Sequence, residues 1–373
     1  MKKLIFVLCL VLACLLAVAW VFKDEMAHPT QPSSPGNTTG AADPTTAPTT
    51  EPTVPPTTVI ADGWQEMDGD RYYYLGGEAI TGWQEVDGMY RYFHADGKLA
   101  VGFAEVDGNR YCFDAEGCYL TGWQEVDGKF YYLGNDGIVV TGWLPLEEKL
   151  YYLKEDGSMA RGCVEIDGVN HYFTSTGAPV LMLNPWNFLP EDYTPDLVVL
   201  DNYYGHNNKK VASICHDALI EMMKACNKQS GHRVYVLSAY RSVTSQEKLF
   251  KNEVQSNLKK GYSQEEAERL AATVVAVPGT SEHHSGLAVD IIDSCCSWEL
   301  EEIQETLPGQ QWLMEHSWEY GFILRYPNGT TDHTGIIYEP WHYRYVGVEL
   351  AKELHDLGMT LEEYMDMLTE MDA

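Results

Sequence analysis

The pattern of apolar and polar positions divides the chain into four stretches. Residues 1–26 are dominated by one uninterrupted apolar run, and residues 27–60 are rich in Pro, Thr, Ser and Gly with few large apolar side chains. Aromatic residues then recur at a fixed interval through 61–182, and helical and strand patterns mix in 185–373. We predict in turn a signal peptide or membrane anchor, an extended linker, a repeat region and a folded domain.

The first stretch predicts export. Its apolar run, Leu4 to Phe22, follows two lysines and is about long enough to span a bilayer. Three outcomes are open: the segment is retained as an anchor, it is cleaved at the small-residue pattern Ala17-Val18-Ala19, or the chain is lipidated at Cys14. Each outcome places the remaining residues outside the cytoplasm, and the first also attaches the chain to the membrane.

The repeat region has a period of about twenty residues. Its marker is a glycine that comes before an aromatic residue or, once, a cysteine, at Gly63, Gly82, Gly102, Gly122, Gly142 and Gly162. Within a unit, a turn such as Asp127-Gly128 precedes an aromatic strand such as Tyr131-Tyr132. Because one hairpin alone is marginal in water, we predict about six short hairpins stacked into a β-hairpin solenoid.

The last stretch, 185–373, mixes helix and strand signals. Apolar spacing predicts a helix over 211–228, and apolar runs predict buried strands at 234–237 and 287–292. Ser263 and Thr360 each begin a sequence typical of a helix N-terminal capping box. We therefore predict an α+β domain in which helices pack on a small antiparallel sheet.

The charge balance narrows the class of partner. The formal net charge is −30, from 25 Lys and Arg against 55 Asp and Glu. So acidic a chain repels phosphate backbones, which argues against nucleic acid as a partner.

Nine cysteines are present in this chain, for which we predict export. Cys112 and Cys118 flank a predicted turn and could pair, because an oxidising compartment permits disulfides. Cys215 and Cys226 lie in one predicted helix, where they would be about 16 Å apart, too far for a bridge. No cysteine spacing is typical of a zinc–thiolate site, so a zinc ion would need other ligands.

Three clusters of polar residues interrupt the apolar pattern of the last stretch. They are the segments 281–290 (Ser-Glu-His-His-Ser-Gly-Leu-Ala-Val-Asp), 339–345 (Glu-Pro-Trp-His-Tyr-Arg-Tyr) and 238–242 (Ser-Ala-Tyr-Arg-Ser), with Gln246 just beyond. Each cluster supplies residue types that a different part of metal-assisted hydrolysis requires.

His283, Asp290 and His342 together offer two imidazoles and one carboxylate. Catalytic zinc takes three such ligands and keeps one position for water. Asp290 sits in an otherwise apolar strand, where a carboxylate is costly to bury unless it is paired or bound to a metal. We therefore predict one zinc ion in this domain, bound by these three side chains, with the adjacent His284 outside the ligand set.

Two further residues fit catalytic roles. Glu339 lies three residues before His342, so its carboxylate can take a proton from water near the metal and later pass it to the leaving amine. Arg241 can stabilise the oxyanion that forms when water attacks a peptide carbonyl.

The motifs Ser-x-His-x-x-Gly-x-Ala-x-Asp at 281–290 and Glu-x-Trp-His at 339–342 resemble those of the VanY-type zinc D-alanyl-D-alanine carboxypeptidases. Tyr240-Arg241-Ser242 with Gln246, and the segment 321–327, are similar to the same family. The resemblance implies the zinc ligands and catalytic roles given above. It also implies that Ser281 and Gln246 help to bind the substrate.

The repeats resemble the choline-binding and related cell-wall-binding repeats of Gram-positive surface proteins, in their period and in their Gly-Trp pairs. The resemblance implies binding of a wall polymer, through aromatic cages where choline is present. The position two residues after the turn glycine, often Trp in choline binders, is Arg71 in the first unit and Arg110 in the third. This departure leaves the wall ligand open.

The predicted function is removal of the terminal D-alanine from peptidoglycan stem peptides by an extracytoplasmic zinc peptidase, held at the wall by its repeats. Two alternatives stay open: an L,D-carboxypeptidase that acts on tetrapeptide stems, and a wall-binding surface protein without catalysis. D,D and L,D cleavage need the same zinc, base and arginine, so the motifs do not separate them. The sequence also leaves open whether the role is wall maturation, turnover or lowered sensitivity to drugs that bind the stem terminus.

Overall fold

The computed structural model describes residues 60–372 apart from 148, 206 and 296–298. The predicted signal or anchor (1–26) and almost all of the predicted linker lie outside these residues. In the part of the chain that is described, no helix is both long and apolar enough to cross a bilayer. Contacts divide the chain into two compact units, of which one contains residues 160–372 with 149–151 and the other contains the rest of the repeat region.

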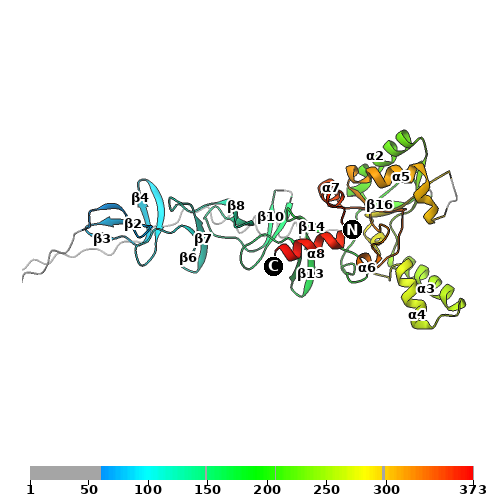
Figure 1. Cartoon of the computed structure of the whole chain (residues 1–373), viewed down its shortest axis with the longest axis horizontal. Coiled ribbons are helices and arrows are strands. Elements are labelled where there is room, and N and C mark those ends of the chain that lie inside the picture. Colours follow the sequence, from blue (N-terminus) through cyan, green and yellow to red (C-terminus); the bar gives the residue numbers. More distant parts are fainter. Residues whose placement is uncertain (1–59, 148, 206, 296–298, 373) are drawn as a thin grey trace, which may run out of the picture. The chain divides into compact units, whose positions relative to one another are not determined.

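The repeat region up to residue 159 is a succession of antiparallel hairpins (Figure 1). The strands are β1 (Gly63–Met67), β2 (Asp70–Leu75), β3 (Glu78–Ala79), β4 (Gly82–Val86), β5 (Met89–Phe93), β6 (Gly102–Val106), β7 (Asn109–Phe113), β8 (Gly122–Val126), β9 (Lys129–Leu133), β10 (Gly142–Leu146) and β11 (Lys149–Leu153). The turn between β8 and β9 has positive φ at both Asp127 (53°) and Gly128 (75°), which matches the right-handed twist of a tight hairpin.

Neighbouring repeats share their core, as the solenoid prediction requires. Trp83 packs edge-on against Tyr92 of its own hairpin, with ring centroids 5.3 Å apart, and against Tyr111 of the next hairpin at the same separation. The backbone N–H of Leu99 donates to the carbonyl of Arg71 in the preceding unit. The hairpin solenoid is therefore confirmed. Cys112 and Cys118 are both unbridged, so the structure shows no disulfide between them.

The second unit begins with the last hairpin and continues into the α+β domain. Its strands are β12 (Gly162–Ile166), β13 (Val169–Phe173), β14 (Pro179–Val180), β15 (Leu197–Val199), β16 (Lys210–Ala212), β17 (Val234–Ser238), β18 (Ala288–Asp293), β19 (Phe322–Leu324) and β20 (His342–Tyr345). Its α-helices are α2 (Ser213–Ser230), α3 (Val243–Lys259), α4 (Gln264–Val274), α5 (Pro308–His316), α6 (Thr331–Thr334), α7 (Val348–Leu357) and α8 (Leu361–Met371), and its 3₁₀ helices are η1 (Glu282–Ser285), η2 (Glu302–Thr306) and η3 (Ser317–Tyr320).

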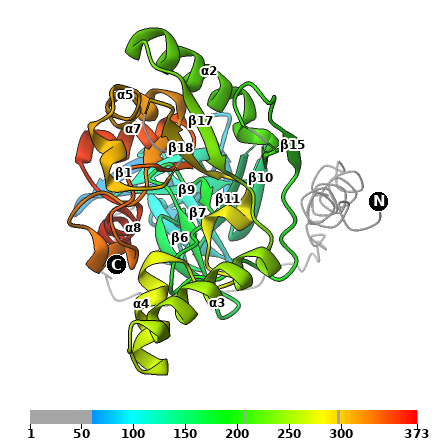
Figure 2. The ribbon, with the colours of Figure 1, turned by 90° about the vertical axis from the view of Figure 1, so that its right-hand side faces the viewer.

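A four-stranded antiparallel sheet in the order β17-β18-β20-β19 forms the centre of this domain. Helix α2 buries Leu219 and Met222 in the same core as Val236 and Ile291 of the sheet. Helices α3 and α4 contact each other and lie at the opposite end of the domain from α2 in both views (Figures 1 and 2). The predicted small antiparallel sheet with helices is confirmed.

The C-terminal helix α8 packs on the last hairpin, which belongs to the same compact unit. The backbone N–H of Cys163 donates to the Thr369 hydroxyl at 2.7 Å, and the Ser175 hydroxyl donates to the Glu353 carboxylate at 2.9 Å. The last hairpin is thereby attached to the α+β domain through both α7 and α8.

Candidate metal centre

Strand pairing brings the predicted metal ligands together. Asp290 on β18 lies directly opposite His342 on β20, and opposite Ser238 on β17. His283 comes from η1, the short 3₁₀ turn that leads into β18. Gly286 ends that turn with φ +74°, and a Cβ there would lie 2.8 Å from Leu197 Cδ2. The glycine of the motif therefore permits the tight turn that directs His283 at Asp290.

The three side chains form one buried cluster. His283 Nε2 lies 3.2 Å from Asp290 Oδ2, and His342 Nδ1 lies 3.1 Å from Asp290 Oδ1. One ligand atom from each residue lies within 4.8 Å of the other two. The predicted ligands thus converge, although they are far apart in the sequence.

The cluster fits a divalent metal by its chemistry. Asp290 Oδ1 is buried and has no hydrogen bond of acceptable geometry, which suits an atom that binds a metal. Burial lowers the pKa of His283, so its imidazole is neutral as a metal ligand must be. Burial alone would raise the pKa of Asp290, but His283 and His342 outweigh burial and hold that pKa well below its usual value. Burial would lower the pKa of His342, but Asp290 and Glu282 raise it to about 9, so this ring loses a proton when a metal binds. Two imidazoles and a carboxylate are a catalytic zinc set.

Glu339 lies beside this cluster. Its carboxylate Oε2 is 3.5 Å from His342 Nδ1. Burial raises the pKa of Glu339 to about 8, and the nearby Asp290 charge adds to the effect. A carboxylate whose pKa is close to neutral can both accept and return a proton, as a general base and acid must.

Arg241 faces the cluster from the loop after β17. Its Nη2 lies 3.8 Å from Asp290 Oδ2, while Nη2 also donates to the Ser238 hydroxyl at 2.7 Å. Its Nη1 donates to Gln246 Oε1 at 2.8 Å. Burial lowers the pKa of Arg241, but Asp290 and Glu339 oppose that effect, and a guanidinium remains charged in proteins.

Ser281 and Gln246, the two residues predicted to bind the substrate, both lie at the site. Both are buried and line the same cavity as the candidate ligands. The amide of Gln246 is engaged within the protein, because its oxygen accepts from Arg241 and its nitrogen donates to the Ala276 carbonyl at 2.7 Å. The geometry therefore connects Gln246 to Arg241, a contact that the sequence did not reveal.

A cavity of about 430 Å³ opens over the cluster. Its lining includes the polar side chains named above and the apolar residues Leu249, Val274, Ile336 and Trp341. The site thus offers a peptide an apolar surface beside a group of ionisable residues, a combination typical of small-ligand sites.

Two functional features escaped the sequence analysis. Glu282, inside the first motif, is buried and lies 3.3 Å from His342 Nε2. His284, which we predicted to lie outside the ligand set, has a supporting contact that the sequence did not reveal: its ring bridges the Arg241 carbonyl (2.7 Å) and the Gly279 N–H (3.2 Å). The sequence offered one clue to Glu282, its position next to His283 in the motif. Its contacts could not be predicted, because its partners come from distant segments of the chain.

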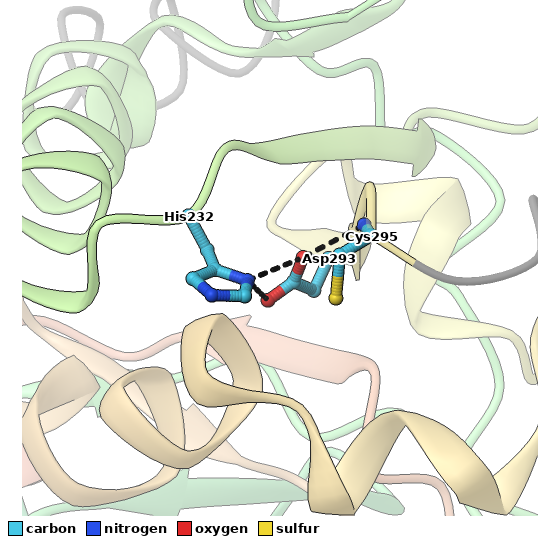
Figure 3. A group of neighbouring side chains, drawn as sticks. All are labelled: His232, Asp293 and Cys295. Carbon is cyan, nitrogen blue, oxygen red and sulfur yellow. Dashed lines mark hydrogen bonds and ion pairs between the residues drawn. The ribbon is translucent and has the colours of Figure 1, made fainter.

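A second cluster, His232, Asp293 and Cys295, lies at the other end of β18 (Figure 3). His232 Nδ1 is 3.1 Å from Asp293 Oδ2. The Asp293 carboxylate also accepts the backbone N–H of Cys295 at 3.0 Å and of Gly309 at 2.8 Å. These contacts hold the turn after β18 against the first turn of α5, so the burial of Asp293 has a structural explanation.

Comparisons with known proteins cover both units. The VanY family model, described as D-alanyl-D-alanine carboxypeptidase, matches residues 208–348, and a choline-binding repeat model matches residues 120–162. The chain is 37% identical over 195 residues to the putative carboxypeptidase YodJ of Bacillus subtilis, which is 51% of this chain and 68% of that protein. It is 35% identical over 187 residues to a D-alanyl-D-alanine carboxypeptidase of Enterococcus faecalis, covering 50% of this chain and 65% of the relative.

Among solved structures, the chain is similar to the vancomycin resistance D,D-pentapeptidase VanY in complex with Zn(II). The two are 36% identical, with a TM-score of 0.44, and the match covers 50% of this chain and 97% of that one.

Proposed function

Because the chain belongs to the VanY family of D-alanyl-D-alanine carboxypeptidases, we propose that it removes the C-terminal D-alanine of peptidoglycan stem peptides at one zinc ion bound by His283, Asp290 and His342. The convergence of these three buried side chains on one point carries the proposal. The family is one of zinc-dependent hydrolases, and the site supplies the ligand types that a catalytic zinc takes.

The side chains around the ligands fit the steps of peptide hydrolysis. When bound, a zinc ion would act as a Lewis acid, which lowers the pKa of water to about 7. Glu339, with its raised pKa, accepts a proton from the attacking water and returns it to the leaving amine. Arg241, fixed by Ser238 and Gln246, directs its positive charge at the oxyanion that develops on the substrate carbonyl. Ser281 lines the same cavity, where its hydroxyl can hydrogen-bond to the substrate.

The repeats associate the enzyme with the cell wall, outside the cytoplasm. We propose that their ligand is a wall polymer rather than choline alone. The guanidinium of Arg71 already lies 4.6 Å from the ring centroid of Trp64, and that of Arg110 lies 4.1 Å from the ring centroid of Phe103. A quaternary ammonium would have to displace these internal cations from the aromatic faces.

Mass spectrometry of defined stem peptides tests the proposed reaction. The chain lacking residues 1–26 is incubated with a pentapeptide stem ending in D-Ala-D-Ala and, separately, with the tetrapeptide stem. We expect the pentapeptide to lose one alanine and the tetrapeptide to remain intact. A chelator should stop the reaction, and added zinc should restore it.

The Glu339→Gln variant separates catalysis from binding. We expect it to keep zinc and wall binding while product formation falls below detection, because the amide cannot accept the proton. Shortening of the tetrapeptide alone would assign L,D-carboxypeptidase activity instead. Wall binding with neither peptide cleaved would leave a non-catalytic surface protein as the better account.

A further inference from the structure

His342 is held on both sides of its ring. On one side Nδ1 faces Asp290, in the position of a metal ligand. On the other side Nε2 lies 3.3 Å from Glu282 Oε2. A histidine that binds a metal through Nδ1 carries its proton on Nε2, so Nε2 donates to the Glu282 carboxylate. Such a partner fixes both the tautomer and the orientation of the ligand ring.

Glu282 is itself fixed by two buried arginines. Its Oε1 accepts from Arg325 Nε and from Arg344 Nη1, each at 2.8 Å. All three side chains are about 1% exposed, so their charges are removed from water and depend on one another. Two guanidinium groups at 2.8 Å keep the Glu282 carboxylate ionised, so it accepts hydrogen bonds only.

The chain of contacts continues to the C-terminal helix. Arg325 donates to the Glu362 carboxylate through both terminal nitrogens, at 2.8 Å and 2.5 Å. Glu362 lies in the first turn of α8, and Asn184 donates to its Oε1 at 3.0 Å. Arg344 reaches the same region, where its Nη2 donates to the Leu181 carbonyl at 2.8 Å.

These outer contacts come from parts of the chain beyond the VanY family match. Glu362 follows its end at residue 348, and Leu181 and Asn184 precede its start at residue 208. The metal ligand His342 is thus connected, through three consecutive ion pairs or hydrogen bonds, to a helix that the family match does not include.

We propose that Glu362 on α8 is a positioning residue for the metal centre: it holds Arg325, which holds Glu282, which directs Nδ1 of His342 at the metal. The inference rests on the proposed function only in taking His342 as a metal ligand. Removing a hydrogen-bond partner of a ligand typically costs about 10–100-fold in metal affinity, and Glu362 acts on the ligand through such a partner.

Zinc affinity in competition with a chelator tests this role without measuring hydrolysis. We expect Glu282→Gln to weaken zinc binding by about 10–100-fold. Glu362→Gln should weaken it by a smaller factor, about tenfold. The double variant should bind zinc no more weakly than Glu282→Gln alone, because coupled residues are not additive.

The matched control lies next to Glu362 on the same helix. Glu363 accepts the backbone N–H and the hydroxyl of Thr360 in a capping box. Glu363→Gln removes a negative charge from the first turn of α8, as Glu362→Gln does, but does not touch Arg325. We expect its zinc affinity to equal that of the unmodified chain. If Glu363→Gln and Glu362→Gln weaken zinc binding equally, helix stability explains the effect and the proposal is wrong.

A gentler variant keeps the test decisive if Glu362→Gln does not fold. Glu362→Asp retains the buried negative charge but shortens its reach to Arg325, and an intermediate loss of zinc affinity is expected. Zinc affinity unchanged in Glu362→Asp or in Glu362→Gln would overturn the proposal. A His342→Ala variant with undiminished zinc affinity would instead overturn the proposed metal site itself.

Discussion

Arg241 depends on neutral neighbours more than on its nearest charge. Its contacts with the Ser238 hydroxyl (2.7 Å) and the Gln246 oxygen (2.8 Å) are shorter than its 3.8 Å approach to Asp290. The two hydrogen bonds fix both terminal nitrogens of the guanidinium. They keep the guanidinium beside the metal ligands without making it a tight partner of Asp290, so its charge remains available to a substrate.

This arrangement predicts the effect of Gln246→Leu. The variant removes the acceptor for Arg241 Nη1 and leaves the metal ligands untouched, so zinc affinity should be unchanged. We expect kcat/KM to fall by about tenfold, the equivalent of about 1.4 kcal/mol, chiefly through kcat because the arginine acts in the transition state. Steady-state kinetics on the pentapeptide measure the change.

The matched control for this prediction is Gln255→Leu, an exposed glutamine on the same helix, α3. It should leave kcat/KM unchanged. An equal loss in the two variants, or a loss confined to KM in Gln246→Leu, would show that Gln246 does not act by positioning Arg241.

At this scale the sequence predicted a set of site residues, of which the structure brings the three candidate metal ligands together, but it did not reveal how these residues are supported. Asp290 stood out because a carboxylate in an apolar strand is costly to bury unless it is paired or bound to a metal. His283, His342 and Glu339 stood out because they complete the ligand set and the general base that zinc-assisted hydrolysis requires. The supporting contacts of Glu282 come from Arg325 and Arg344, which are distant in sequence and meet it only in the folded chain. The pattern of residues along the chain does not show which distant side chains pair in the fold.

Among the elements of the site, the short turn η1 requires a glycine at its end. Gly286 ends it in the left-handed region, with a Cβ position 2.8 Å from Leu197 and 3.0 Å from the Ala212 nitrogen. Gly231 ends α2 with the same φ of +74°, but its Cβ position meets nothing within 4 Å. The two glycines share a conformation and differ only in their surroundings.

This pair predicts different costs for the same substitution. Gly231→Ala should lower the free energy of unfolding by about 1 kcal/mol, the cost of a left-handed alanine. Gly286→Ala should cost more, because a side chain must also displace Leu197 and a backbone nitrogen, and it should weaken zinc binding because His283 lies in the same turn. Denaturant unfolding and chelator competition measure the two effects. Equal unfolding free energies would contradict the role assigned to close packing.

Element patterns were predictable where periodicity was strong. The repeat hairpins and the strand predicted at 287–292 appear, the latter as β18 at Ala288–Asp293. Helix α3 was not predicted. It carries a short apolar stripe, Phe250, Val254 and Leu258, that packs on α4, but the polar Gln246 and Asn257 are also buried on it and obscure the period. The three-residue strand β19 is too short to produce a period.

On the scale of the whole molecule, the last hairpin belongs to the compact unit that contains the α+β domain. The sequence assigned residues 160–182 to the repeats by their period, and they do form a hairpin with β14 added. Their contacts, however, are with α7 and α8: Cys163 with Thr369, and Ser175 with Glu353 and the Tyr364 hydroxyl. The sequence period predicts the local hairpin structure. The compact unit to which a hairpin belongs depends instead on which surfaces are buried together.

This assignment predicts how the chain tolerates truncation. A chain beginning at residue 160 keeps β12–β14 and their contacts with α8, so it should fold and bind zinc as the longer chain does. A chain beginning at residue 185 removes those strands together with Leu181 and Asn184, which accept from Arg344 and donate to Glu362. It also uncovers the buried α8 residues Met365 and Leu368, which pack in one cluster with Met182.

We therefore expect a lower melting temperature and weaker zinc binding for the chain from 185 than for the chain from 160, measured by thermal unfolding with and without zinc. If the two chains have the same melting temperature and the same zinc affinity, the last hairpin does not stabilise the α+β domain and this prediction is wrong.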